Sequence, residues 1–119
     1  YYPKSIKEDN FVYKKDFYIA VAEKHYRKTL GHFEKVSGYG EVLRTRKGRE
    51  IEFGFDKRSG GWYITEISTG MGLGCVYETR MKALASLTAD MLNKVEMALN
   101  TDTAKAVSRN IMEYKSKCA

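Results

Sequence analysis

The stretch that decides the fold is residues 41–67, EVLRTRKGREIEFGFDKRSGGWYITEI. Ile51, Phe53 and Phe55 alternate there with glutamate or glycine, which is the period-2 pattern of a strand with one buried face. Glycine-containing turns at 46–49 and 56–61 separate this strand from one on each side. We therefore expect an antiparallel meander of three strands, at 41–46, 50–56 and 62–67.

Apolar residues at spacings of three and four predict helices on both sides of this meander. Positions 19, 22, 26, 30 and 33 indicate a helix at 17–36, with Asp16 as its N-cap and the sequence SGYG at 37–40 as its end. Thr79 is the expected N-cap of a second helix, in which Leu87, Met91 and Val95 belong to a buried stripe that runs from 84 to 99. A third helix is expected from 101 or 102 to about 117.

The predicted fold is a single α+β domain over 1–119, in the order α-β-β-β-α-α, with helices covering the sheet and an irregular N-terminal arm at 1–15. A Gly-rich connection at 69–74 follows the third strand and leaves open a short fourth strand at 75–77. The apolar seam of the third helix, at 104, 107, 111, 114 and 118, favours packing on its own domain. Its narrow, heptad-like spacing also leaves open a homodimer through this helix.

The composition is that of an ordinary globular protein, with 43% apolar and 30% charged residues in 119. No apolar run approaches the roughly 18–20 residues of a membrane span, and the N-terminus has no secretory signal pattern. Two widely separated cysteines, Cys75 and Cys118, favour a reducing, cytoplasmic setting over a disulfide scaffold. Because the sequence starts at Tyr1 and not at Met, the alternative that it is a piece of a longer protein stays open.

No motif indicates a reaction or a cofactor. His25 and His32 lie two turns apart in the expected first helix, whereas zinc-binding pairs on helices normally lie one turn apart with further ligands nearby. The Gly-rich segment at 70–74 lacks the spacing of a dinucleotide fingerprint and the Gly-Lys-Ser/Thr of a phosphate loop. We therefore predict a protein that is not an enzyme and that has no metal site.

The more informative cluster consists of cations around the first hairpin turn. The candidate binding residues are Arg44, Arg46, Lys47 and Arg49, joined by Arg80 and Lys82 unless a fourth strand carries the second helix to the other end of the sheet. With a net charge of +6, these residues predict a partner that is either an acidic protein surface or nucleic acid. The alternative is a turn whose charges serve only solubility.

Two resemblances bear on the partner. The order α-β-β-β-α resembles the double-stranded RNA-binding domain, and TRMKA at 79–83 is loosely similar to the basic KKxAK run that starts the second helix of that family. Residues 62–70 together with 79–84 look like segments of small phage and mobile-element proteins. This second resemblance implies a non-catalytic protein that binds host nucleic-acid machinery or defence nucleases.

The leading functional prediction is a non-enzymatic binding module of phage or mobile-element type. It would engage, and in one version inhibit, a host nucleic-acid-handling or defence nuclease complex. The alternative prediction is a domain that binds DNA or double-stranded RNA directly. Both predictions place the contact at the basic turn, because its cations protrude from the fold and are not needed in the core.

Overall fold

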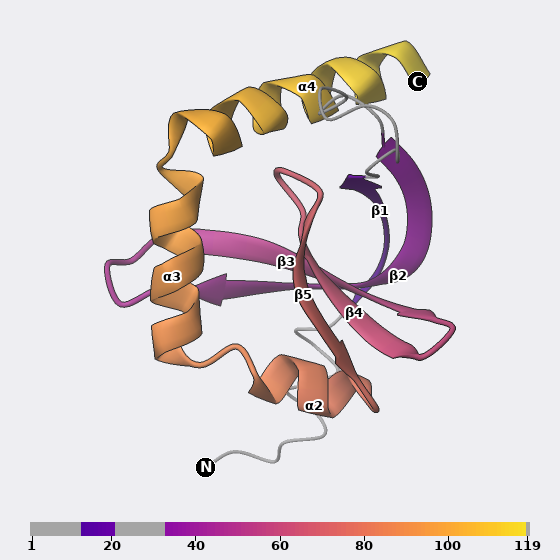
Figure 1. The fold of residues 1–119 in the computed structure, drawn as a ribbon, viewed down its shortest axis with the longest axis vertical. Coiled ribbons are helices and arrows are strands. Elements are labelled where there is room, and N and C mark those ends of the chain that lie inside the picture. Colours follow the sequence, from indigo (N-terminus) through magenta and orange to yellow (C-terminus); the bar gives the residue numbers. More distant parts are fainter. Residues whose placement is uncertain (1–12, 21–32, 119) are drawn as a thin grey trace.

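The structure is a computed structural model that describes residues 13–20 and 33–118. It contains a five-stranded antiparallel sheet followed by three helices (Figure 1). The strands are β1 (Tyr13–Ala20), β2 (Phe33–Arg44), β3 (Glu50–Arg58), β4 (Gly61–Glu66) and β5 (Met71–Tyr77), and they lie in the sheet in this order. The helices are α2 (Arg80–Ala85), α3 (Ala89–Leu99) and α4 (Asp102–Cys118). The α+β class with an antiparallel sheet is confirmed, but three strands in the order α-β-β-β-α-α is wrong.

The helix expected at 17–36 is contradicted where the structure describes it. Residues 17–20 belong to β1 and 33–36 to β2, and these strands pair from Tyr13 opposite Gly40 to Ala20 opposite Phe33. Phe17 and Ile19 are buried while their neighbours are more exposed, so burial alternates from one residue to the next, as it does in a strand. Pairing between distant segments outweighs the local helical spacing. The expected irregular arm ends earlier than predicted, since residues 13–15 are strand, and residues 1–12 lie outside the described part.

The predicted helix end at 37–40 lies inside β2. A Cβ atom at Gly38 would lie 2.2 Å from the Phe55 carbonyl oxygen, and one at Gly40 would lie 2.8 Å from the Tyr13 ring. These glycines therefore permit close packing between strands and do not end a helix. Because residues 33–40 pair with β1, β2 begins at Phe33, well before the predicted start at 41.

The strand left open at 75–77 exists and is longer, because β5 starts at Met71. Its pairing with β4 shifts between Tyr63, which lies opposite Val76, and Thr65, which lies opposite Gly72. This irregularity contains Gly74, whose φ of +86° is a conformation that glycine adopts readily. The Gly-rich segment is thus mostly a bulged edge strand, and only its first residues form a turn.

The second predicted helix is divided in two. Thr79 is the N-cap of α2, where its hydroxyl accepts a hydrogen bond from the Lys82 amide at 3.0 Å. A second cap, Thr88, accepts from the Met91 amide at 3.2 Å and starts α3 in a new direction. The third helix is confirmed as α4, with Thr101 accepting from the Ala104 amide at 3.2 Å.

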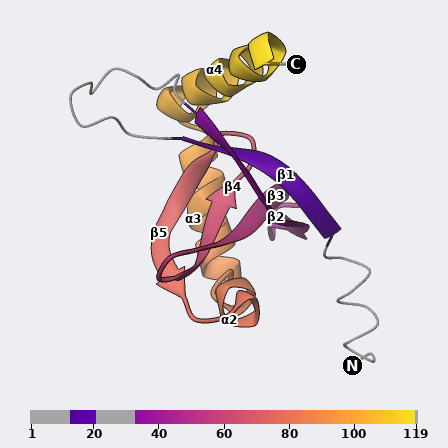
Figure 2. The same cartoon turned by 90° about the vertical axis from the view of Figure 1, so that its right-hand side faces the viewer.

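Buried apolar residues form three clusters, two of which join helices to the sheet. The largest lies between one sheet face and helices α2 and α3, and consists of Ile51, Phe53, Phe55, Ile64, Ala83, Leu87, Leu92 and Val95. On the opposite face, Phe17 lies over Gly54, where a Cβ would come within 2.6 Å of its ring. The α4 seam packs on Phe33 through Val107 and Ile111. In Figure 2, α4 and α2 lie at opposite ends of α3. None of the described helices is long and apolar enough to cross a membrane.

The sheet coils until its first strand meets the turn between β4 and β5. The Ala20 amide donates to the Gly70 carbonyl oxygen at 2.7 Å. Gly70 has a φ of +73°, and a Cβ there would lie 3.0 Å from the Tyr18 carbonyl oxygen and 3.1 Å from the Ile111 side chain. The end of β1, the β4–β5 turn and α4 are therefore packed together at one end of the molecule.

Candidate anion-binding site

The four cations predicted around the first hairpin lie at the β2–β3 turn, residues 45–49, and beside it. The turn is closed by hydrogen bonds from the Thr45 amide to Arg49 O, at 2.8 Å, and from the Gly48 amide to Thr45 O, at 2.9 Å. All four residues are exposed: Arg44, Arg46, Lys47 and Arg49. Each arginine also contacts a neighbouring side chain. The turn is therefore a solvent-facing cationic surface, as the sequence predicts.

The contacts of the three arginines differ. Arg44 pairs with Glu50 at 3.0 Å, and Arg46 lies 3.8 Å from the Asp90 carboxylate. Both pairs are exposed and each contributes little to stability. Arg49 donates instead to the neutral Asn100 amide oxygen at 3.0 Å, which holds its guanidinium beside the end of α3 without cancelling its charge.

The other two candidates, Arg80 and Lys82, do not join this surface. Because β5 is a full strand, it carries the chain to the end of the sheet where Trp62 lies opposite Tyr77, and α2 starts there (Figure 1). Arg80 lies over the Tyr39 ring, 4.5 Å from its centroid, and Lys82 pairs with Glu78 at 3.0 Å. The six predicted cations thus form two separate groups.

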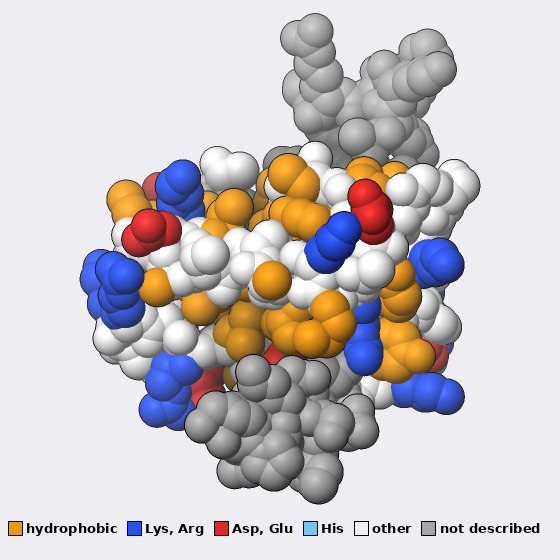
Figure 3. Space-filling model, turned by 90° about the horizontal axis from the view of Figure 1, so that it is seen from below, with side chains coloured by type: hydrophobic (Ala, Val, Ile, Leu, Met, Phe, Trp, Pro, Cys, Tyr) orange, Lys and Arg blue, Asp and Glu red, His pale blue; other side chains and the backbone are white. Residues whose placement is uncertain are grey.

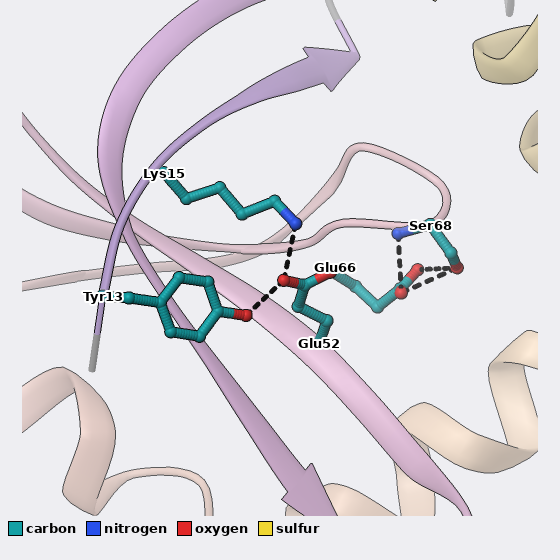
Figure 4. Close-up of polar contacts among 5 residues, drawn as sticks. All are labelled: Tyr13, Lys15, Glu52, Glu66 and Ser68. Carbon is teal, nitrogen blue, oxygen red and sulfur yellow. Dashed lines mark hydrogen bonds and ion pairs between the residues drawn. The ribbon is translucent and has the colours of Figure 1, made fainter. Parts of the chain in front are cut away.

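The β4–β5 turn next to Arg49 is organised by a buried carboxylate. Glu66 accepts hydrogen bonds from the Ser68 amide at 2.9 Å, the Thr69 amide at 3.1 Å and the Thr69 hydroxyl at 2.7 Å. Figure 4 shows the Glu66 side chain turned toward Ser68. With its oxygens engaged in this way, Glu66 acts as a turn-forming group that fixes the two hydroxyl residues beside Arg49.

A polar pocket of about 200 Å³ lies between the β4–β5 turn, the end of α3 and the first turns of α4. It is lined by Arg49, Ser68, Thr69, Leu99, Asn100, Ala104, Lys105 and Ser108. None of these lining residues is acidic, and among the described residues no carboxylate lies within 4 Å of the Lys105 ammonium. Two cations, the Ser108 hydroxyl and the Asn100 amide thus converge on one hollow, whereas the Ser68 and Thr69 hydroxyls there already donate to Glu66. Such a set of donors suits an anion with several acceptor oxygens.

Sequence patterns did not indicate Lys105 and Ser108 as site residues. Both flank the apolar seam of α4, next to Ala104 and Val107, so their spacing showed only that they lie at the border of a buried stripe. Their proximity to Arg49 depends on how α4 crosses the end of the sheet. No local pattern carries that information.

A second polar group lies beside this pocket, where side chains of β1 reach over β2 to β3. Tyr13 and Lys15 both donate to the Glu52 carboxylate, Lys15 at 2.6 Å (Figure 4). Burial would raise the pKa of Glu52, but the hydrogen bonds from Lys15 and Tyr13 and the charges of Lys15 and Lys115 together hold the pKa below its usual value. Burial, reinforced by the bonded Glu52, raises the pKa of Tyr13 to about 12. At neutral pH the group is therefore an ionised carboxylate held by an ammonium and a neutral phenol.

A hollow of about 360 Å³ next to Glu52 shares Arg49, Ser68 and Leu99 with the polar pocket and adds Lys115. Its lining also includes three glutamates, so it has no excess of positive charge with which to bind an anion. The excess of cations lies on the Arg49–Lys105 side. We therefore take the polar pocket as the candidate site.

No cluster of three or more metal-binding side chains occurs in the described part of the chain. His25 and His32 lie outside that part. The thiol of Cys75 is free and exposed on β5, and the Cys118 side chain is not among those described.

Comparison of the chain with protein-family models, with curated proteins and with solved structures finds no match. The resemblance to the double-stranded RNA-binding domain depends on an element order that the structure replaces with five strands followed by three helices. The resemblance of residues 62–84 to phage proteins stays a prediction.

Proposed function

We propose that this protein is a non-enzymatic module that binds nucleic acid through its phosphate groups. The observation that carries the proposal is the polar pocket, in which Arg49 and Lys105 converge with the Ser108 hydroxyl and the Asn100 amide and no acidic residue joins the lining. A phosphate has several acceptor oxygens and suits donors that converge from three segments of the chain. The exposed cations of the adjoining β2–β3 turn would contact neighbouring phosphates.

Among the functions predicted from the sequence, this pocket favours direct nucleic-acid binding over the leading prediction of a purely protein-binding module. A cytoplasmic location is part of the proposal. A homodimer through α4 stays a prediction, and it would have to use the outer side of the helix. The seam residues Ala104, Val107 and Ile111 are already buried within the chain, whereas Met112 is 67% exposed.

The proposal predicts a specific weakening on charge reversal. In Lys105→Glu and Arg49→Glu, affinity for labelled DNA should fall, and the slope of log affinity against log salt should decrease by roughly one for each phosphate that the variant no longer neutralises. Fluorescence anisotropy across a salt series measures both quantities. Lys57→Glu is the matched control, because this exposed lysine lies at the opposite end of β3 and its replacement changes net charge equally.

Three outcomes separate the alternatives. Equal reductions of affinity in Lys105→Glu and Lys57→Glu would show that binding depends only on net charge. That result would contradict the polar pocket as the binding site. No binding to DNA or RNA at low salt would contradict the proposed function. A normal salt slope in Lys105→Glu alone would show that Lys105 does not touch a phosphate.

A second candidate function is the contact with a host nucleic-acid-handling or defence nuclease complex, as in a phage protein. The observation in its favour is the α2 end of the molecule, where hydrophobic side chains gather across the middle of the surface (Figure 3). Met81 is 51% and Val76 47% exposed. Contiguous exposed apolar surface is typical of protein contacts. A nuclease-treated pull-down with Met81→Asp as the comparison tests it, because a protein contact survives removal of nucleic acid and should depend on Met81.

A further inference from the structure

A second cavity adjoins the polar pocket and differs from it in chemistry. It has a volume of about 220 Å³ and lies between the start of β5 and the α3–α4 junction. Most of its lining is apolar, and we call it the apolar hollow: Met71, Leu73, Val95, Ala98, Leu99 and Ala104. Gly72, three threonines and Glu66, whose carboxylate is engaged by Ser68 and Thr69, complete the lining. Thr69, Leu99 and Ala104 line both cavities, so the polar pocket and the apolar hollow are immediate neighbours.

Thr101 fixes the junction between α3 and α4, which forms one wall of the apolar hollow. Its hydroxyl donates to the Ala98 carbonyl oxygen at 2.7 Å and accepts from the Ala104 amide at 3.2 Å. These bonds join the end of α3 to the start of α4 and fix the position of Ala98 relative to Ala104. On the opposite side, the turn that carries Thr69 is fixed by the hydrogen bonds to Glu66. Both cavities are therefore parts of a preformed surface.

We infer that the polar pocket and the apolar hollow together form one site for a nucleotide unit of single-stranded nucleic acid. The phosphate lies in the polar pocket between Arg49 and Lys105, and the base lies in the apolar hollow against aliphatic side chains and Met71. This inference rests on the proposed function, since it names the form of nucleic acid that the same site takes.

The chemistry of the two cavities selects this ligand. An occupant needs an anionic group with several acceptor oxygens next to a compact apolar group. In a duplex the bases are stacked inside, whereas a single strand can turn a base outward into a protein cavity. The apolar hollow is smaller than the roughly 300–1,000 Å³ of pockets for drug-sized ligands, so it suits one ring system that is attached to a larger molecule.

The side chains of the apolar hollow also suit a base. A methionine thioether makes favourable contacts with aromatic rings. Thr103 adds a hydroxyl at the hollow, which can donate to or accept from the edge of any base. Such contacts are tolerant of sequence, so we expect preference for single strands without a strong preference for one base.

The test compares three labelled DNA probes of equal length: a single strand, the same strand without bases in its central part, and the duplex. The normal single strand should bind about 2- to 12-fold more tightly than the abasic strand, as expected for one aromatic ring in contact with a thioether. Ala98→Leu, which fills the hollow from α3, should remove this difference and leave binding of the abasic strand unchanged. Ala98→Ser is the size-matched control and should bind as the parent does.

The outcomes separate this inference from the proposed function. If duplex and abasic strands bind as tightly as the normal strand, and Lys105→Glu still weakens all three, the inference is wrong and the proposed function stands. If neither Arg49→Glu nor Lys105→Glu weakens the binding of any probe, the proposed function itself fails, because the polar pocket then contacts no phosphate. Thr103→Leu fills the same hollow from α4 and replaces Ala98→Leu if that variant melts at a lower temperature than the parent. Tighter binding of a phosphotyrosine peptide than of the single strand would also overturn the inference.

Discussion

At the scale of single residues, the carboxylate of Glu52 shows how one side chain ties together segments that are distant in the sequence. It lies on β3 and accepts hydrogen bonds from Tyr13 and Lys15, both on β1. Strands β1 and β3 are not neighbours in the sheet, because β2 lies between them. The contact therefore bridges over β2 across one face of the sheet and stabilises its coiled shape.

The lowered pKa of Glu52 predicts a pH-dependent contribution to stability. A carboxyl group whose pKa is lower in the folded than in the unfolded state stabilises the fold above its unfolded pKa, here 4.5, and loses this contribution as pH falls through the folded pKa. The free energy of unfolding of the parent should therefore exceed that of Glu52→Gln at pH 6, and the gap should narrow toward pH 3. Urea unfolding at the two pH values measures the gap.

Glu50→Gln is the matched control for this experiment. Glu50 lies on the same strand, but its side chain is 61% exposed and its pair with Arg44 lies on the surface. An exposed pair contributes little, so this variant should differ less from the parent at either pH. A pH-independent gap between the parent and Glu52→Gln would contradict the role assigned to the Glu52 charge.

At the scale of elements, the break between α2 and α3 lets two short helices follow one coiled face of the sheet. A single helix from 80 to 99 would be straight, whereas the face formed by Ile51, Phe53 and Phe55 is coiled. Thr88 restarts the helix in a new direction, and Leu87 lies buried at the break. The buried position predicted for Leu87 and Val95 is confirmed, and Met91 is partly buried against the same cluster.

Leu87→Ala should lower the free energy of unfolding by roughly 2–4 kcal/mol, because it removes buried methyl groups and leaves a cavity between α2 and α3. Met97→Ala is the control on α3, since Met97 is 59% exposed and its truncation should change stability by less than about 0.5 kcal/mol. Thermal and urea unfolding measure both. Equal stabilities of the two variants would show that Leu87 is not part of the core.

At the scale of the whole molecule, Gly70 lies where the end of β1, the β4–β5 turn and α4 come together. Its amide donates to Glu66 O at 2.8 Å and its carbonyl oxygen accepts from Ala20. This same turn places Ser68 and Thr69 in the polar pocket. The closure of the sheet and the geometry of the candidate site therefore depend on one residue.

Gly70→Ala should destabilise the fold more than Gly48→Ala does. Both glycines have positive φ, so each substitution adds backbone strain of roughly 1–3 kcal/mol. At Gly70 the added Cβ would also lie 3.0 Å from the Tyr18 carbonyl oxygen, while at Gly48 it meets nothing within 4 Å. Denaturant unfolding of both variants isolates this packing contribution. If the two variants are equally destabilised, the contact of β1 with the turn is looser than described.

Local features of this protein could be predicted from its amino-acid sequence. Alternation around Phe53 specified β3, the hydroxyl caps Thr79 and Thr101 specified where α2 and α4 begin, and the cations at 44–49 specified a basic turn. Each of these depends on residues within a few positions of one another. Steric, capping and turn preferences act at that range, which is why a pattern could reveal them.

The remaining features depend on contacts between distant segments. Residues 17–20 are strand because β1 finds a partner in β2, and β5 separates Arg80 from the basic turn because the Gly-rich segment pairs with β4. The candidate site joins Arg49 to Lys105 only because α4 crosses the end of the coiled sheet. Pairing and packing between distant segments contribute more free energy than local propensity does, and their partners cannot be read from spacing along the chain.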